Sequence, residues 1–262
     1  TIAISGTGAN AIRVSGSATS TLYGTNSDDG SLFCFTGHNN TTTSSNANTL
    51  NPRAVVKVDH TGAYSIATTY TSASGNQTRS ATTIDNSNFY IADQGGQFTN
   101  GTTTASPTGN FRSIKSFGGT VYVGQASGTP TAIQVATTSS ISGGTITGLS
   151  GLSNNANLQD FYLVSSSSNG STYDILYIVS ATSNTAGTIA KYSLVSGTWT
   201  ANGSFTTTFG GFGIVAEDEG DGANIYVSTG QGALTANSVR KLTDGAGYNA
   251  TINITGNVIL YT

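Results

Sequence analysis

Two arginines in similar surroundings are the residues of this sequence best suited to bind a ligand. Arg79 and Arg112 each lie shortly after a Gly-Asn pair and directly before a serine. Two guanidinium groups side by side can hold a carboxylate or a sulfate through paired hydrogen bonds. Asp160 stands near the corresponding place in a later part of the chain. These three residues form a candidate ligand site; the alternative is that each arginine only hydrogen-bonds the backbone of a neighbouring repeat.

A second candidate is an acidic turn towards the end of the chain. Its carboxylates belong to Glu217, Asp218, Glu219 and Asp221, with glycines among and after them. Ca²⁺ takes six to eight oxygen ligands, many of them from carboxylates, so the turn is a candidate calcium site. The spacing does not match an EF-hand loop, and the alternative is a solvated turn without metal. We expect no other cofactor.

The residues needed for nucleophilic catalysis are sparse. The sequence has one cysteine, Cys34, and two histidines, His38 and His60. A nucleophile needs a base beside it, and zinc needs three or four ligands from His, Cys or carboxylates. Both histidines lie in polar segments typical of turns, whereas Cys34 lies in an apolar segment that favours burial. The sequence therefore predicts no catalytic residue and no enzyme.

The composition indicates an all-β protein outside the cell. Only 8% of the residues are charged, the net charge is -3, and Gly, Ser, Thr and Asn are abundant. Thr, Val, Ile, Tyr and Phe dominate the ordered segments, as they do in strands. The scattered basic residues argue against nucleic-acid binding, and no apolar stretch is long enough to insert into a membrane. The sequence lacks Met, which we interpret as removal of a leader or as a fragment.

Self-similar segments indicate a repeated four-stranded unit. One segment has the pattern apolar, Tyr, apolar, small residue, and a second has Lys, a Gly turn and an aromatic residue. Placed in order, they describe an antiparallel meander of the kind found in propeller blades. The Tyr segments lie at 89–92, 121–124, 176–180 and 225–228, with 32–37 as a fifth copy, and the Lys segments lie at 56–64, 191–199 and 241–248.

We predict a single β-propeller domain over residues 1–262, with about five to six four-stranded blades. A sandwich would scramble the strand order and a solenoid would have a shorter, stricter period, so both are the weaker alternatives. Residues 1–5 are expected to add one strand. The blades are expected at about 19–72, 76–108, 109–150, 158–208 and 210–262.

These repeats resemble a functionally uncharacterised family of secreted bacterial β-propeller proteins. The likeness rests on the segment 75–80, the Tyr strands and the hairpins at 190–199 and 241–248, and it covers residues 17–255. It implies a secreted propeller and no particular activity, because unrelated propellers share such structural motifs. Family members continue further at both ends, with strands that complete the ring.

The first hypothesis for function is a non-enzymatic structural protein, extracellular or on the cell surface. Exposed strand edges can pair with another chain, and low net charge removes repulsion between copies. We therefore expect self-assembly into a homo-oligomer or filament, or adhesion. The alternative is a propeller that binds surface glycans or small anions at the mouth of its channel. A propeller hydrolase or lactonase is a third hypothesis, for which Asp160 is the only candidate residue.

Overall fold

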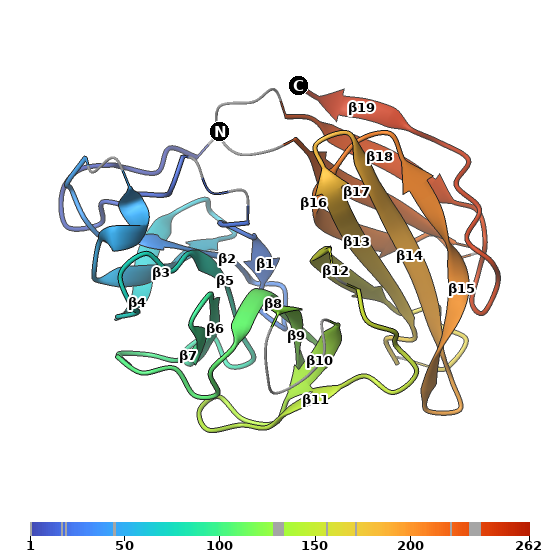
Figure 1. The fold of residues 1–262 in the computed structure, drawn as a ribbon, viewed down its shortest axis with the longest axis horizontal. Helices are drawn as coiled ribbons and strands as arrows, with labels where there is room; N and C mark the ends of the chain where they lie inside the picture. The colour runs from blue at the N-terminus through green and yellow to red at the C-terminus, as the bar shows by residue number, and fades with distance from the viewer. Residues whose placement is uncertain are drawn as a thin grey trace. The chain divides into compact units, whose positions relative to one another are not determined.

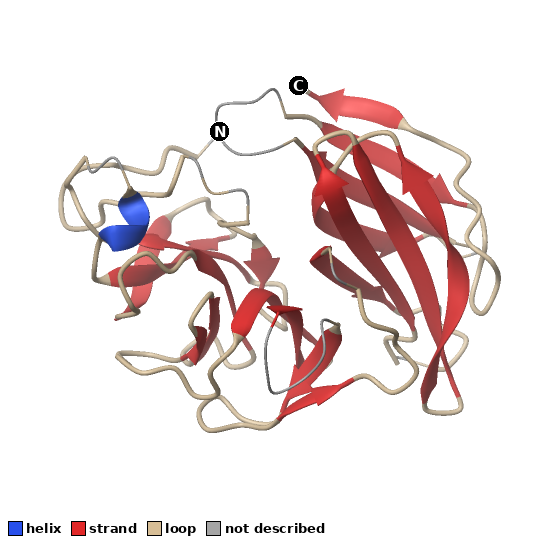
Figure 2. Cartoon of the chain, viewed as in Figure 1, coloured by secondary structure: helices blue, strands red, loops and turns tan. Residues whose placement is uncertain are grey.

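The computed structural model describes residues 2–262 except Ser17, Thr19, 44–45, 128–133, Ala156, Ser171, Asp221 and 231–236. Nearly all regular structure in this part of the chain is β-strand, and Ala47–Thr49 (η1) forms a turn of 3-10 helix (Figure 2). Among the described residues, no helix is long and apolar enough to cross a membrane. The chain divides into two compact units, one of residues 1–132 and 136–147 and one of 133–135 and 148–262.

The first unit holds three antiparallel sheets that follow one another in chain order (Figure 1). Gly118 and Gly119 join two strands of the third sheet with φ angles of 59° and 77°, the conformation that two-residue hairpins need. The strands are β1 (Thr25–Asn26), β2 (Leu32–His38), β3 (Arg53–Asp59) and β4 (Tyr64–Tyr70); β5 (Thr78–Thr83), β6 (Phe89–Asp93) and β7 (Gly96–Phe98); and β8 (Asn110–Phe117), β9 (Thr120–Ser127), β10 (Val135–Thr138) and β11 (Ile146–Gly148).

The second unit holds two four-stranded antiparallel sheets. Ser196 and Gly197, with φ angles of 49° and 80°, form the turn of its longest hairpin, as the Lys and Gly pattern predicts. The strands are β12 (Leu158–Val164), β13 (Ile175–Ser183), β14 (Ala186–Val195) and β15 (Thr198–Thr207); and β16 (Gly211–Asp218), β17 (Ala223–Thr229), β18 (Val239–Asp244) and β19 (Val258–Tyr261).

Apolar side chains fill the space between successive sheets within each unit. In the first unit, Cys34 and Val55 of the first sheet pack in one buried cluster with Ile91 and Phe98 of the second. Cys34 is fully buried, as the sequence predicts, and this burial raises the pKa of its thiol to about 12. Face-to-face packing of consecutive sheets is how propeller blades form their core.

Hydroxyl groups join the first strands of neighbouring sheets in the first unit. Strand β5 is buried along its whole length although it reads Thr-Arg-Ser-Ala-Thr-Thr. The hydroxyl of Thr82 donates to the carbonyl of Asn26 at 2.8 Å and lies 2.8 Å from the hydroxyl of Ser116. The Ser80 hydroxyl accepts from the backbone N–H of Ile114 at 2.7 Å. These bonds satisfy polar groups that would otherwise be costly to bury.

This architecture confirms the predicted fold class, an all-β propeller of antiparallel meander blades. Four of the five sheets have four strands, whereas β5, β6 and β7 make a sheet of three among the described residues. The extra strand expected at 1–5 is not seen: residues 2–5 lie outside any strand, and Thr1 lies outside the described residues. The backbone N–H of Ser5 donates instead to the Tyr64 hydroxyl at 2.9 Å. A single domain over the whole chain stays a prediction.

Candidate functional site

The candidate site begins with Arg79, whose side chain is buried in the first unit. Arg79 lies on β5, and the residue is 4% exposed. Its Nη1 donates to the backbone carbonyl of Ser20, and its Nη2 lies 3.4 Å from the side-chain oxygen of Asn110. The Nε atom is buried and has no hydrogen-bond partner. The alternative to a ligand site was that each arginine only hydrogen-bonds the backbone of a neighbouring repeat. The bond from Arg79 to Ser20 is of this kind, because Ser20 lies in the segment that leads into the first sheet.

Arg112 approaches the same serine from the next sheet. It lies on β8, and its Nη1 donates to the Ser20 hydroxyl at 2.9 Å. The two arginines that the sequence pairs are therefore brought together at Ser20, one on its carbonyl and the other on its side chain. Ser20 itself gave no signal in the sequence, because it stands in a serine- and threonine-rich segment where no single residue is distinctive.

The electrostatic surroundings of Arg79 favour an anion. Burial lowers the pKa of Arg79 to about 10; Tyr23 and Asp93 oppose this shift, and the nearby charge of Arg112 adds to it. Two buried ion pairs join Arg53 to Asp93 and Lys191 to Asp244, and Arg79 takes part in neither. A buried cation without a carboxylate partner is costly, and a bound oxyanion would relieve that cost.

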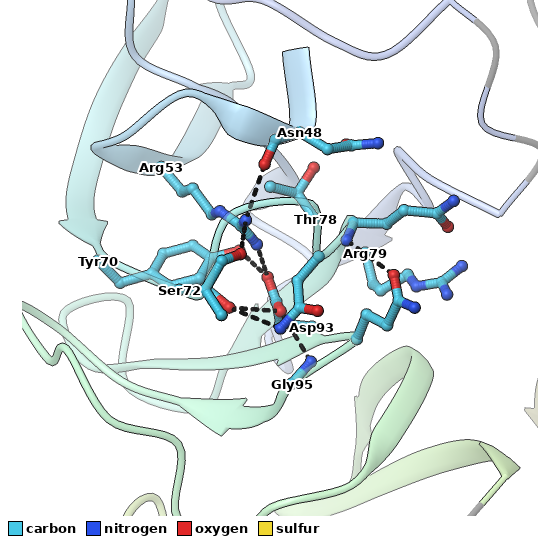
Figure 3. Close-up of polar contacts among 12 residues, drawn as sticks. Asn48, Arg53, Tyr70, Ser72, Thr78, Arg79, Asp93 and Gly95 are labelled. Carbon is cyan, nitrogen blue, oxygen red and sulfur yellow. Dashed lines mark hydrogen bonds and ion pairs between the residues drawn. The ribbon is translucent and has the colours of Figure 1, made fainter. Parts of the chain in front are cut away.

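A separate network surrounds Asp93, on the strand paired with that of Arg79 (Figure 3). Its Oδ2 lies 2.6 Å from Nη1 of Arg53 and accepts from the Tyr70 hydroxyl at 3.0 Å. Its Oδ1 accepts from the Ser72 hydroxyl and the Gly95 N–H, both at 2.9 Å. Burial raises the pKa of Tyr70 well above its ordinary value, so this phenol stays neutral. Both carboxylate oxygens of Asp93 are therefore hydrogen-bonded, and the residue is fully buried. Its ion pair with Arg53 joins the first two sheets.

The second unit repeats this chemistry with different residues. Lys191 on β14 lies 2.9 Å from Oδ2 of Asp244 on β18, and the Tyr177 hydroxyl donates to the same oxygen at 2.8 Å. The other oxygen accepts from the backbone N–H groups of Ala246 and Asn253. Both units therefore bury a cation, a carboxylate and a tyrosine between neighbouring sheets. Sequence reasoning missed these networks, because each carboxylate lies far along the chain from a main partner: Asp93 is 40 residues from Arg53, and Asp244 is 67 residues from Tyr177.

Asp160, the third predicted ligand residue, lies in the second unit. It is 2% exposed on β12. Its Oδ2 accepts from the backbone N–H of Ile214 on β16 at 3.0 Å, and its Oδ1 accepts from the N–H of Phe161. This carboxylate joins the first strands of the two sheets, as the hydroxyls do in the first unit. Its part in ligand binding stays a prediction.

The acidic turn has internal partners where it is described. Glu217 accepts from the Tyr226 hydroxyl at 2.5 Å, Asp218 accepts from the N–H of Gly220, and Glu219 accepts from the side chain of Asn224. Asp221 lies outside the described residues. Across the described part of the chain, no three His, Cys, Asp or Glu side chains converge as metal ligands. The calcium site stays a prediction.

The two histidines differ in their surroundings. His38 is completely buried at the end of β2, where its Nδ1 lies 2.9 Å from the carbonyl of Leu50. Burial lowers the pKa of His38. The expected turn position is therefore wrong for His38, which ends a buried strand, whereas His60 lies exposed in the turn between β3 and β4. Cys34 is a poor nucleophile, because burial raises the pKa of its thiol and so keeps it protonated.

Comparisons with known proteins are sparse. No protein-family model matches the chain, and no curated protein matches it. The chain is similar to a solved structure described as a "putative 6-phosphogluconolactonase" from Bacteroides uniformis. The two are 13% identical, the match covers 90% of this chain and 70% of that one, and the TM-score is 0.48. A likeness of this size transfers neither an activity nor a site to this chain.

The prediction of a non-enzymatic structural function is wrong. The sequence favoured a non-enzymatic structural protein that assembles or adheres through strand edges. A solved structure found by comparison is instead described as a putative lactonase, and no feature of the described residues supports a structural role. The prediction that the chain is not an enzyme is likewise without support. The propeller part of the family resemblance is confirmed, whereas membership of the secreted bacterial family stays a prediction.

Proposed function

We propose that the first unit binds a small oxyanion, a carboxylate or a sulfate, at Arg79 and Arg112. The observation that carries the proposal is the buried guanidinium of Arg79, which is in no ion pair among the described residues and meets Arg112 at Ser20. Perturbed charged groups of this kind concentrate at functional sites. A ligand could be a free anion or an acidic sugar of a surface glycan.

The geometry supports recognition of a flat or tetrahedral oxyanion. The two arginines come from neighbouring sheets, on strands held in register by the contact between Ser80 and Ile114 at 2.7 Å. Their positions are therefore set by the fold before any ligand arrives, which lowers the entropic cost of binding. The Nε of Arg79 is buried and lacks a hydrogen-bond partner, and arginine binds oxyanions well because its N–H groups are fixed in a plane.

The test is calorimetric titration with sodium sulfate and with sodium glucuronate, at an ionic strength held constant with sodium chloride. Arg112→Gln removes one cation of the site, and Arg240→Gln is the control. Arg240 is equally half-buried, in the second unit, where it contacts Asn257 and the ring of Phe209. We expect Arg112→Gln to weaken binding at least tenfold and Arg240→Gln to leave it unchanged.

Two results would overturn the proposal. One is that neither anion binds to the unmodified chain at millimolar concentration. The other is that Arg112→Gln binds as tightly as the unmodified chain while its circular dichroism spectrum is intact. Arg112→Lys serves as a second variant: because lysine keeps the charge but lacks the planar fork, it should bind with intermediate affinity.

An extracellular or cell-surface location is also part of the proposal. Its support is the composition, with 8% charged residues and abundant hydroxyl and amide side chains. Fractionation of cells that express the full-length protein checks it directly. Recovery of the protein only from the cytosol would contradict it.

A further inference from the structure

A concave site with an apolar lining lies in the first unit. Its volume is about 410 Å³, within the range of small-molecule pockets. Ile12 and Phe35 are nearly buried, whereas Val14 is 40% and Phe33 47% exposed. Buried side chains therefore form the floor, and half-exposed side chains form the walls. The six lining residues are Ile4, Ile12, Val14, Leu22, Phe33 and Phe35.

The walls of this pocket are fixed by the backbone. The N–H of Ile12 donates to the carbonyl of Ser5 at 2.9 Å. The backbones of Arg13 and His38 exchange two hydrogen bonds, at 2.9 and 2.8 Å. The segment that carries Ile4 and Val14 is thus attached to strand β2, which carries Phe33 and Phe35. The pocket is preformed and does not depend on a ligand for its shape.

Two local features fix the positions of side chains that line the pocket. Leu22 has a φ angle of 61°, a conformation that is rare for a bulky residue and recurs where side chains clamp ligands. Gly24 leaves room for the ring of Phe33, because a Cβ there would lie 2.5 Å from that ring. A side chain at residue 24 would displace the ring, so the glycine sets the position of one wall.

The chemistry of the lining defines the ligand class. All six lining side chains are hydrocarbon, so none can pair with an ionic group. The rings of Phe33 and Phe35 lie 6.0 Å apart, tilted by 43°, and present apolar faces and edges. Covering half-exposed apolar walls is favourable because it removes hydrocarbon surface from water. The concave shape suits a small molecule better than a flat protein surface.

We propose that this pocket binds a neutral apolar small molecule, with an alkyl chain or an aromatic ring. The site is separate from the anion site in its residues and in its chemistry. The two sites share only the segment 20–24, in which Ser20 contacts the arginines and Leu22 lines the pocket.

The test uses N-phenyl-1-naphthylamine, a neutral dye that fluoresces in apolar surroundings. Val14→Phe fills the pocket, and Val215→Phe is the matched control, since Val215 is 47% exposed on a strand of the second unit. Both variants add one exposed aromatic ring. We expect saturable binding of one dye by the unmodified chain, at least tenfold weaker binding by Val14→Phe, and no change in Val215→Phe.

Competition then checks the ligand class. Decanol should displace the dye at lower concentration than decanoate, because no side chain that lines the pocket can pair with the carboxylate. Unchanged dye binding in Val14→Phe would place the dye elsewhere and overturn the proposal. Equal displacement by decanol and decanoate would overturn the neutral ligand class.

Discussion

The hydroxyl of Tyr177 donates a hydrogen bond of 2.8 Å to the carboxylate of Asp244, in the adjacent sheet of the second unit. Both side chains are fully or almost fully buried, and Lys191 pairs with the same carboxylate oxygen. The first unit likewise brings a cation and a tyrosine to one carboxylate, that of Asp93. The repeated choice indicates that these networks hold neighbouring sheets together.

Removing the charge of Asp244 is expected to destabilise the protein strongly. Asp244→Asn leaves Lys191 buried without a carboxylate, and the expected loss in the free energy of unfolding is about 3–5 kcal/mol. Tyr177→Phe removes one hydrogen bond to a charged group and should cost about 1.5–3 kcal/mol. Urea unfolding followed by the fluorescence of Trp199 measures both. Asp218→Asn, at an exposed residue, is the control, and an equal loss there would contradict the prediction.

Thr82 is expected to stabilise the contact between neighbouring first strands. Thr82→Val keeps the shape of the side chain but leaves the carbonyl of Asn26 and the hydroxyl of Ser116 without this partner. The expected loss is about 1–3 kcal/mol. Thr200→Val, at an exposed residue of β15, should change the free energy of unfolding by less than about 0.5 kcal/mol. Equal effects of the two substitutions would show that the buried hydroxyl contributes nothing specific.

Cys34 is expected to resist alkylation while the protein is folded. Burial raises the pKa of its thiol from 9.0 to about 12, and only the thiolate reacts. Iodoacetamide at pH 8 should therefore modify Cys34 only in urea, as mass spectrometry can show. The unfolded chain releases this proton at lower pH than the folded chain, so the contribution of Cys34 to stability is complete below pH 9 and is lost as the pH rises towards 12. Rapid alkylation under native conditions would contradict this account.

Leu22 provides a test that separates strain from ligand binding. Leu22→Gly relieves the positive φ angle, which costs a non-glycine residue about 1–2 kcal/mol, and removes a side chain that is 41% exposed. We expect the free energy of unfolding to stay unchanged or rise, while dye binding at the apolar pocket weakens. Parallel thermal unfolding and dye titration measure the two effects. A clear loss of stability with unchanged dye binding would show that Leu22 serves packing alone.

The repeating meander could be predicted from the sequence because its signals are local. The Tyr strand beginning at Phe89 and the turn at Gly197 can each be predicted from a few consecutive residues. The same holds for the similarity between Arg79 and Arg112. Ser20, which brings these arginines together, could not be predicted, since it lies 59 residues from Arg79 and 92 from Arg112. Burial of His38 and the pairing of Asp93 with Arg53 are likewise products of the tertiary structure.

The hydroxyl contacts between first strands carry a consequence for how such a chain changes over time. In the first unit, neighbouring sheets meet through side chains such as Ser80 and Thr82, and through single main-chain bonds such as that from the N–H of Asp28 to the carbonyl of Thr83 at 2.9 Å. The strand ladders themselves stay within one sheet, so neighbouring sheets can differ in their number of strands, as the three-stranded sheet of β5, β6 and β7 illustrates. Duplication and recombination can exchange blades joined in this way, provided that the contacts between their first strands persist.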